Sequence, residues 1–193
     1  MTLLTQIMEH NQEFVEKKEY EQFLTDKFPD KKMVIITCMD TRLTELLPRA
    51  INLRNGDAKI IKSAGAVVSH PFGAIMRSVI VAVYELGAKE VLVIGHHDCG
   101  MTNLNAKSVL DKAKDVGGIT EEMVTLLQNA GINLNSWLKG FDNVHDSVTQ
   151  SVSMIRNHPL LPKQIPVHGL IIEPSTGKLE LVVDGYKSLQ ASE

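Results

Sequence analysis

The sequence has few cysteines, few aromatic residues and no excess of positive charge, and each shortage argues against a class of protein. Only two of its 193 residues are cysteines, Cys38 and Cys99, and they do not form a Cys-x-x-Cys motif, which argues against a redox pair. Aromatic residues make up 5% of the chain, the basic residues are scattered and the formal net charge is −3. The chain therefore lacks the basic, aromatic-rich surface typical of nucleic-acid binding.

Long apolar runs are also missing. No window approaches the ~18 consecutive apolar residues of a membrane span. Residues 1–10 contain neither a basic start nor a clean apolar run, so they do not have the pattern of a signal peptide. We therefore expect a cytoplasmic protein with no membrane and no nucleic-acid partner, in which thiols stay reduced. A hydrophobic content of 44% fits a single domain over 1–193, with residues 1–25 as an N-terminal helical arm.

The apolar residues that are present follow strand and helix patterns in alternation. Runs of strand length are expected to form strands at 33–37, 58–62, 91–94, 166–172 and 179–183. Helices are expected at 2–25 with a break near Asn11, at 43–47 with an end at Pro48, and at 73–86, 100–111, 120–129 and 144–157. Because helices separate the first four strands, we predict an α/β fold: a parallel four-stranded sheet flanked by helices, with a fifth, antiparallel strand at its edge.

Two of the expected strands end in residues that favour a metal site. Cys38 follows the strand 33–37, and His96 and Cys99 follow the strand 91–94. The carboxyl ends of parallel strands meet at one edge of a sheet, and ligands collect where the strand order reverses. Zinc takes thiolate and imidazole ligands, and a catalytic site leaves a fourth position open. We interpret the three residues as a candidate zinc site, although a buried core cysteine is the commoner interpretation of either thiol alone.

The loop after Cys38 also carries an ion pair suited to act on water. Asp40 and Arg42 stand two and four residues after Cys38. A carboxylate beside an arginine stays ionised and can accept a hydrogen bond from water at the metal, while the arginine fork fixes the carboxylate. We interpret His97 as flanking the site rather than shuttling protons, and Asp98 as a loop hydrogen-bonding residue rather than a base.

Together these motifs resemble the β class of carbonic anhydrases. The pattern Cys38-x-Asp40-x-Arg42 followed by His96-x-x-Cys99 is similar to that class. The second motif reads Gly-His-x-Asp-Cys-Gly-Met, which is similar to the compact prokaryotic branch. The resemblance covers most of the chain, and it is the combination of both motifs, each after a buried strand, that makes it specific.

The resemblance implies a fold, a cofactor and an activity. It implies the strand order 2-1-3-4, one Zn²⁺ per chain on Cys38, His96 and Cys99, and a metal-bound hydroxide that attacks carbon dioxide to give bicarbonate and a proton. It makes Asp40 and Arg42 the pair that orients and activates the bound water. Since the aspartate binds zinc directly in some members, Asp40 is also a candidate pH-dependent gate. The resemblance further implies a homodimer, or a dimer of dimers, in which the N-terminal helices clasp the partner.

The substrate pocket is expected to include Ala64 and Gly65. Family members often have Arg-Asn-Ala-Gly after the second strand, whereas this chain has Lys62-Ser63-Ala64-Gly65. Ala64 and Gly65 still let backbone N–H groups approach a substrate oxygen, and the substituted pair alters the edge of the pocket.

Two other functions stay open beside carbonic anhydrase (a lyase), which is the leading hypothesis. The same zinc site would suit hydrolysis of carbon disulfide or carbonyl sulfide, because the metal ligands do not separate these substrates from carbon dioxide. The other alternative is a non-catalytic zinc-binding protein with a closed site. The presence of both Asp40 and Arg42 disfavours it, because a purely structural site needs no water-activating pair.

Overall fold

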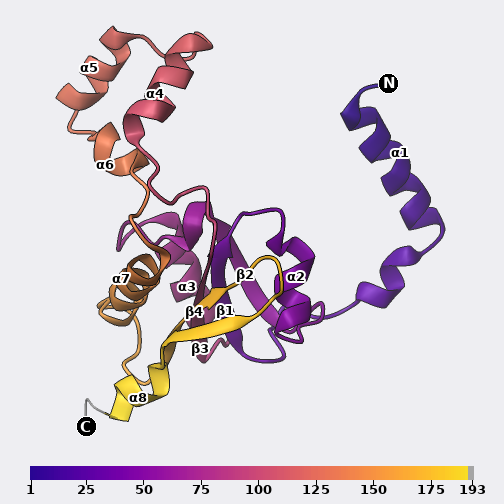
Figure 1. Cartoon of the computed structure of the whole chain (residues 1–193). Coiled ribbons are helices and arrows are strands. Elements are labelled where there is room, and N and C mark those ends of the chain that lie inside the picture. The colour runs from indigo at the N-terminus through magenta and orange to yellow at the C-terminus, as the bar shows by residue number, and fades with distance from the viewer. Residues whose placement is uncertain (191–193) are drawn as a thin grey trace.

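A five-stranded sheet forms the centre of the computed structural model, which describes residues 1–190 (Figure 1). Its strand order is β2-β1-β3-β4-β5. The strands are β1 (Met33–Cys38), β2 (Ala58–Ser63), β3 (Glu90–His96), β4 (Val167–Ile172) and β5 (Leu179–Val183). Neighbouring strands are parallel except for β4 and β5, which are antiparallel. The predicted α/β fold, the order 2-1-3-4 and the antiparallel edge strand are therefore confirmed.

Helices cover both faces of the sheet. The covering helices are α2 (Leu43–Ala50), α3 (Ala74–Tyr84) and α7 (Val144–Arg156). Val34 and Ile36 of β1 belong to the core beneath α3 and α7, whereas Ile35 belongs to the core beneath α2. Successive residues of a strand point to opposite faces, so a strand covered on both sides is apolar at every position. This explains why the central strands appear in the sequence as unbroken apolar runs.

The helix α2 continues two residues beyond its predicted end at Pro48, so that prediction is wrong. Proline has no N–H and removes one helical hydrogen bond. The N–H of Ile51 nevertheless donates to the carbonyl of Leu47 at 3.2 Å. Because Pro48 stands in the last turn, the loss of a single bond does not stop the helix.

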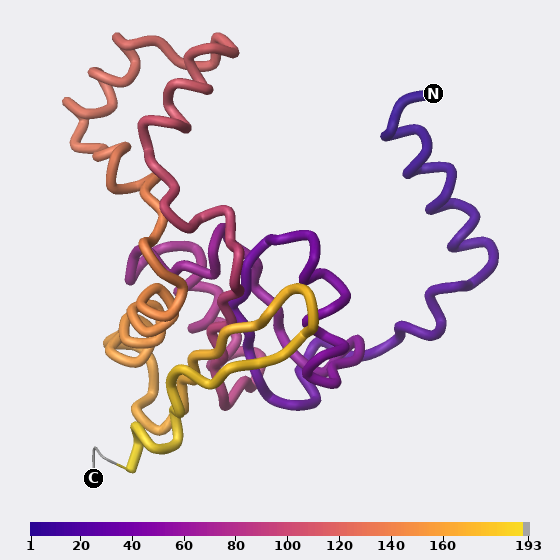
Figure 2. Tube along the Cα trace, in the orientation of Figure 1, coloured from indigo at the N-terminus to yellow at the C-terminus, as the bar shows by residue number. Residues whose placement is uncertain are grey.

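The N-terminal arm is helical, but it is divided at a different place from the predicted one. The helix α1 (Leu3–Glu16) continues through Asn11, and the short 3-10 helix η1 (Glu19–Phe23) follows it. The chain changes direction between them at Lys18, whose φ is 57°, because a left-handed residue cannot continue a right-handed helix. Figures 1 and 2 show the arm standing away from the sheet, and no residue of α1 is buried.

Between β3 and α7 the chain leaves the sheet and forms a projection of three helices (Figure 1). They are α4 (Ala106–Asp115), α5 (Glu121–Asn129) and α6 (Leu134–Leu138). The predicted helix at 100–111 begins late, because the side chain of Asn105 accepts a hydrogen bond from the N–H of Lys107 and caps α4 there. The sequence pattern also missed α6 and the helix α8 (Gly185–Gln190). No helix within residues 1–190 is both long and apolar enough to span a membrane.

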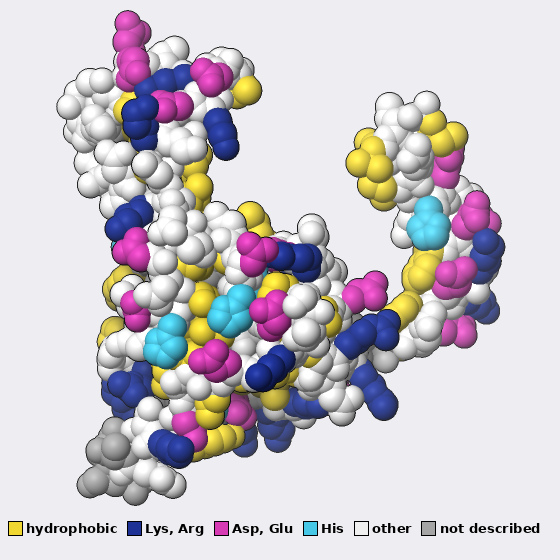
Figure 3. Space-filling view, viewed as in Figure 1, with side chains coloured by type: hydrophobic (Ala, Val, Ile, Leu, Met, Phe, Trp, Pro, Cys, Tyr) yellow, Lys and Arg dark blue, Asp and Glu magenta, His cyan; other side chains and the backbone are white. Residues whose placement is uncertain are grey.

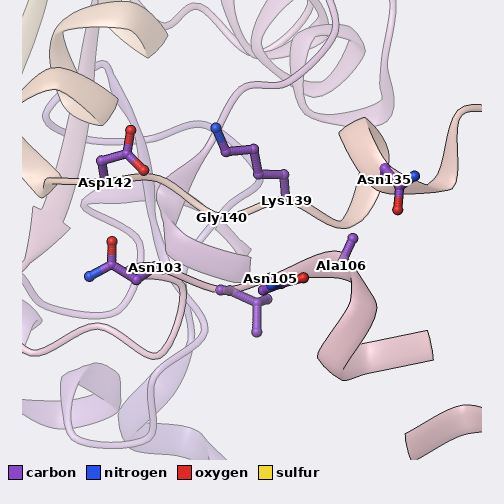
Figure 4. Close-up of a pocket in the computed structure, with 8 residues that line it drawn as sticks. Asn103, Asn105, Ala106, Asn135, Lys139, Gly140 and Asp142 are labelled. Atoms are coloured by element: carbon purple, nitrogen blue, oxygen red, sulfur yellow. The ribbon is translucent and has the colours of Figure 1, made fainter. Parts of the chain in front are cut away.

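The two ends of the helical projection meet beside the sheet. The N–H of Phe141 donates to the carbonyl of Met101 at 3.1 Å, and the N–H of Asn103 donates to the carbonyl of Phe141 at 2.8 Å. A hollow of about 400 Å³ lies at this neck, and several of the residues that line it are polar (Figure 4). Gly140 is required at the crossing, since a Cβ atom there would lie 1.9 Å from the carbonyl oxygen of Met101. The neck therefore fastens the projection to the segment that follows Cys99.

Candidate metal centre

Neighbouring strands bring the three predicted metal ligands together. Cys38 is the last residue of β1, His96 is the last residue of β3, and Cys99 lies in the loop after β3. β1 and β3 pair in parallel, so these strand ends lie side by side. The ligand atoms of Cys38, His96 and Cys99 all lie within 4.8 Å of one another. All three residues are buried, with exposed fractions of 5%, 1% and 7%.

The geometry of this group suits a tetrahedral zinc ion. The Sγ atoms of Cys38 and Cys99 are 3.9 Å apart, and two zinc–sulfur bonds of about 2.3 Å at a tetrahedral angle would separate them by about 3.8 Å. Nδ1 of His96 lies 2.7 Å from the carbonyl oxygen of His97, so Nδ1 carries the proton and donates it. Nε2 then has a free lone pair, is buried, and has no hydrogen-bond partner among the described residues. Such an atom is available as a metal ligand.

Hydrogen bonds favour a negative charge on one of the sulfurs. The thiol of Cys99 hydrogen-bonds to Cys38 and lowers the pKa of Cys38 to about 4, although burial acts in the opposite direction. The N–H group of Gly65, which lies 3.3 Å from Sγ of Cys38, adds to this lowering. The same sulfur–sulfur hydrogen bond, together with burial, raises the pKa of Cys99. Both thiols would ionise together in the presence of a bound cation.

Asp40 and Arg42 form a doubly hydrogen-bonded ion pair beside the ligand group. Nε of Arg42 donates to Oδ1 of Asp40 at 3.0 Å, and Nη2 donates to Oδ2 at 2.8 Å. These side-chain bonds lower the pKa of Asp40 to about 2, against the effect of burial. Oδ2 of Asp40 also lies 3.7 Å from Nε2 of His96. An ionised carboxylate therefore stands at the edge of the Cys–His–Cys group at neutral pH.

A hollow of about 350 Å³ opens beside this carboxylate. Its lining residues are Cys38, Met39, Asp40, Thr41, Ala64, Gly65, Cys99, Gly100 and Met101. Both predicted pocket residues, Ala64 and Gly65, are among them. Gly65 has a φ of 70°, and a Cβ atom there would lie 2.8 Å from Cε1 of Phe141, so glycine is required for two reasons. Its N–H, which the sequence suggested for a substrate oxygen, is directed at the sulfur of Cys38.

The structure adds three residues that the sequence pattern did not assign to the site. Met101 completes one wall of the hollow, and Phe141 packs behind Gly65. No local motif identifies Phe141 as a site residue, because it follows the three helices of the projection and is distant in sequence from both ligand loops. Asp98, which the sequence suggests only as a loop residue, accepts two hydrogen bonds from Arg42. The one feature of the sequence that indicates Asp98 as a site residue is its position directly before Cys99.

Comparisons with known proteins agree with this arrangement. A family model described as carbonic anhydrase matches residues 33–179. A Bacillus subtilis (strain 168) relative named "Putative carbonic anhydrase YvdA" is 61% identical over 188 residues, which cover 97% of this chain and 95% of the relative. A carbon disulfide hydrolase of Saccharolobus solfataricus is 30% identical and aligns with 78% of this chain and 76% of its own. The crystal structure of β-carbonic anhydrase isoform I from Trichomonas vaginalis matches with a TM-score of 0.86 and 35% identity, covering 96% of this chain and 100% of that one.

The chain therefore belongs to the carbonic anhydrase family, and its fold is that of the β class. The family match includes both of the loops that carry the Cys–His–Cys group. The resemblance inferred from the two sequence motifs is confirmed by these matches.

Proposed function

We propose that this protein catalyses the reversible hydration of carbon dioxide to bicarbonate and a proton, with one zinc ion per chain held by Cys38, His96 and Cys99. The observation that carries the proposal is the buried Cys–His–Cys group with an ionised carboxylate at its edge, in a chain of the carbonic anhydrase family. Zinc, when bound, supplies the Lewis acidity that makes water a nucleophile near neutral pH. The cytoplasmic location expected from the sequence stays a prediction.

In this proposal the chain's own residues orient the water and the substrate. Asp40 accepts a hydrogen bond from the reacting water through its carboxylate, which lies 3.7 Å from the ring nitrogen of His96. Arg42 keeps that carboxylate ionised. Because Arg42 donates a hydrogen bond to each of the two carboxylate oxygens, it also prevents the carboxylate from rotating. Met39 and Met101 line the hollow with apolar groups, which suit a small nonpolar gas.

The test is stopped-flow measurement of carbon dioxide hydration across pH, with metal analysis of the same sample. We expect zinc bound in a one-to-one ratio and hydration well above the uncatalysed rate. Removal of zinc with a chelator should abolish the rate, and added zinc should restore it. Full zinc occupancy with no hydration at any pH would contradict the proposed activity and favour a non-catalytic zinc protein.

Hydrolysis of carbon disulfide is the second candidate, because a relative at 30% identity has that name. Both substrates are small linear molecules with an electrophilic carbon, so the same residues would act on either. We expect carbon dioxide to be preferred, since the relative at 61% identity is named for carbonic anhydrase. Both substrates should be assayed on one zinc-loaded sample. A higher kcat/KM for carbon disulfide would reverse the order of the two candidates.

We also propose that two copies of the chain associate through α1 and α3. The apolar side chains of α1 at Leu3, Leu4, Ile7 and Met8 are all more than half exposed, and Figure 3 shows apolar surface along the arm. Two hollows of about 300 and 280 Å³ lie over α3, and Val81 lines both of them. An amphipathic helix without a buried residue and an uncovered apolar surface on the same chain suit an exchange of arms between two copies.

A further inference from the structure

Arg42 is held by the loops after both β1 and β3. Within its own loop it makes the two hydrogen bonds to Asp40. Across the site, its Nη1 donates to Oδ2 of Asp98 at 2.8 Å, and its Nη2 donates to the backbone carbonyl oxygen of Asp98 at 2.9 Å. Asp98 lies in the loop after β3, directly before Cys99. The guanidinium group therefore joins the two loops that carry the Cys–His–Cys group.

The backbone at Asp98 allows both of its acceptors to reach the same guanidinium group. Asp98 has a φ of 52°, in the left-handed region that aspartate and asparagine enter more readily than other side chains. Its side chain is 85% exposed, whereas that of Asp40 is 17% exposed. Water screens an ion pair that is so exposed, so the pair adds little to stability. The contact is better explained by what it does to the position of Arg42.

We propose that Asp98 is a positioning residue, which fixes Arg42 and through it holds the carboxylate of Asp40 beside the metal ligands. Asp40 and Arg42 are near neighbours on one loop, so without a further contact they could move together. The two bonds from Arg42 to Asp98 fasten the pair to the opposite loop. The inference rests on the proposed role of Asp40 in hydrating carbon dioxide, but the placement of Arg42 is measurable independently of that reaction.

Two variants, Asp98→Gly and Asp98→Asn, distinguish the hydrogen bond to Arg42 from the effect of residue 98 on the backbone of the loop. Both new residues accept a left-handed backbone. Glycine removes the carboxylate that binds Nη1 and leaves only the backbone bond to Nη2, whereas asparagine keeps an acceptor oxygen for Nη1. In zinc-loaded protein we expect Asp98→Gly to lower kcat/KM for carbon dioxide about tenfold at unchanged zinc content, as for other groups that orient residues at metal sites. Asp98→Asn should retain most of the rate. Asp115→Gly, on α4, is the matched control and should behave as the wild type.

A double-variant cycle tests whether Asp98 acts through Arg42. In an Arg42→Ala background, Asp98→Gly should cause no further loss of kcat/KM, because the contact that it removes is already absent. An equal loss in both backgrounds would overturn the proposal, since Asp98 would then act by another route. Loss of zinc from Asp98→Gly would overturn it as well, because Asp98 would then serve metal binding. An unchanged rate in Asp98→Gly would have the same consequence.

Crystal structures of the zinc-loaded variants give a readout that does not depend on activity. We expect the guanidinium group of Arg42 to turn away from its wild-type position in Asp98→Gly, because one backbone bond alone does not fix its orientation, and to keep that position in Asp98→Asn. An unmoved Arg42 in Asp98→Gly would contradict the proposed anchoring. If the wild-type protein with full zinc did not hydrate carbon dioxide, the proposed function would fail, and the position of Arg42 would still decide the role of Asp98.

Discussion

At the scale of single residues, the protonation of the two thiols determines what the ligand group can bind. The hydrogen bond between the two sulfurs lowers the pKa of Cys38 and favours a thiolate there, whereas it raises the pKa of Cys99. A divalent cation is held by thiolates and must therefore displace the proton of Cys99. Two thiolates cancel the charge of such a cation and weaken it as a Lewis acid. In the proposed function, the ionised Asp40 beside the group compensates for this weakness by accepting a hydrogen bond from the reacting water.

Substitution of any ligand should abolish stoichiometric zinc binding. Cys38→Ser, His96→Ala and Cys99→Ser each remove one of three donors and leave a site that holds zinc too weakly to survive purification. His97→Ala is the matched control for His96→Ala, because it changes the adjacent imidazole but keeps the backbone carbonyl that orients His96. Metal analysis of the purified proteins measures the effect. Full zinc in all three ligand variants would refute the assignment.

Asp40→Ala should keep zinc and lose carbon dioxide hydration near neutral pH. The substitution removes the acceptor for the reacting water but none of the three ligand atoms, and groups of this kind contribute on the order of 10–100-fold at metal sites. Stopped-flow rates and zinc content should be measured on the same sample. Activity equal to that of the wild type would exclude Asp40 from the mechanism.

Arg42 should also determine how stability depends on pH in acid. The pKa of Asp40 is about 2 in the folded protein, below its usual 3.8. A carboxyl group with a lowered folded pKa stabilises the fold above its unfolded pKa and loses that contribution as pH falls through the folded value. In metal-free protein, Arg42→Ala should therefore make the unfolding free energy fall less steeply between pH about 4 and about 2. Because Arg42 is 42% exposed, solvent screens the pair and the difference should be small.

Urea denaturation at a series of pH values measures this difference. Parallel stability curves for the wild type and Arg42→Ala would show that the Asp40–Arg42 pair does not contribute to folding. Glu45→Ala provides a control, because Glu45 forms a separate, exposed ion pair with Arg49 on α2.

The sequence predicts the three ligand candidates but not the bonds that surround them. Thiols and imidazoles are common zinc ligands, so these residue types alone suggest a metal site. Their positions at strand ends can be predicted because the strands are local apolar runs. The bonds from Arg42 to Asp98 depend on how β1 and β3 align in the sheet. Phe141 lies near Gly65 because backbone hydrogen bonds to Met101 and Asn103 hold it at the neck of the helical projection. Neither contact has a pattern in the local sequence.

At the scale of elements, the five predicted strands agree with the structure to within two residues at each end. Each is a short apolar run between turn residues, so its limits are local properties. The predicted helix at 100–111 begins only after its Asn105 cap, and the residues before that cap, Met101 and Asn103, bond to Phe141 across the neck. These long-range backbone bonds replace the helical ones, and a pattern of nearby residues cannot contain them.

The contact between α7 and the sheet should not tolerate a side chain at Gly95. A Cβ atom at Gly95 would lie 2.8 Å from methyl groups of both Val144 and Val148. Overpacking of this kind costs roughly 1–3 kcal/mol, so Gly95→Ala should lower the unfolding free energy by about that amount. Urea denaturation of metal-free protein measures it. Gly100→Ala is the control, because no atom lies within 4 Å of a Cβ atom there; equal stability of the two variants would show that α7 can move aside.

At the scale of the whole molecule, two extensions leave the sheet, and they differ in how they are held. The helical projection is tied by backbone bonds at Met101 and Phe141. The N-terminal arm has no buried residue in α1, although its apolar residues recur at helical spacing. Such a helix gains most of its stability from packing its apolar face on another surface. The single chain leaves that face uncovered, which is why a second copy is the proposed partner.

We expect the full chain to be a dimer in size-exclusion chromatography with light scattering. Leu4→Glu combined with Ile7→Glu should shift it to monomer, because both side chains lie on the exposed apolar face of α1 and charge there would oppose burial. Gln6→Glu combined with His10→Glu is the matched control, since it adds two acidic residues to the same helix at polar positions. The control should remain a dimer. A monomeric wild type, or a dimer that survives Leu4→Glu with Ile7→Glu, would show that α1 does not join two copies.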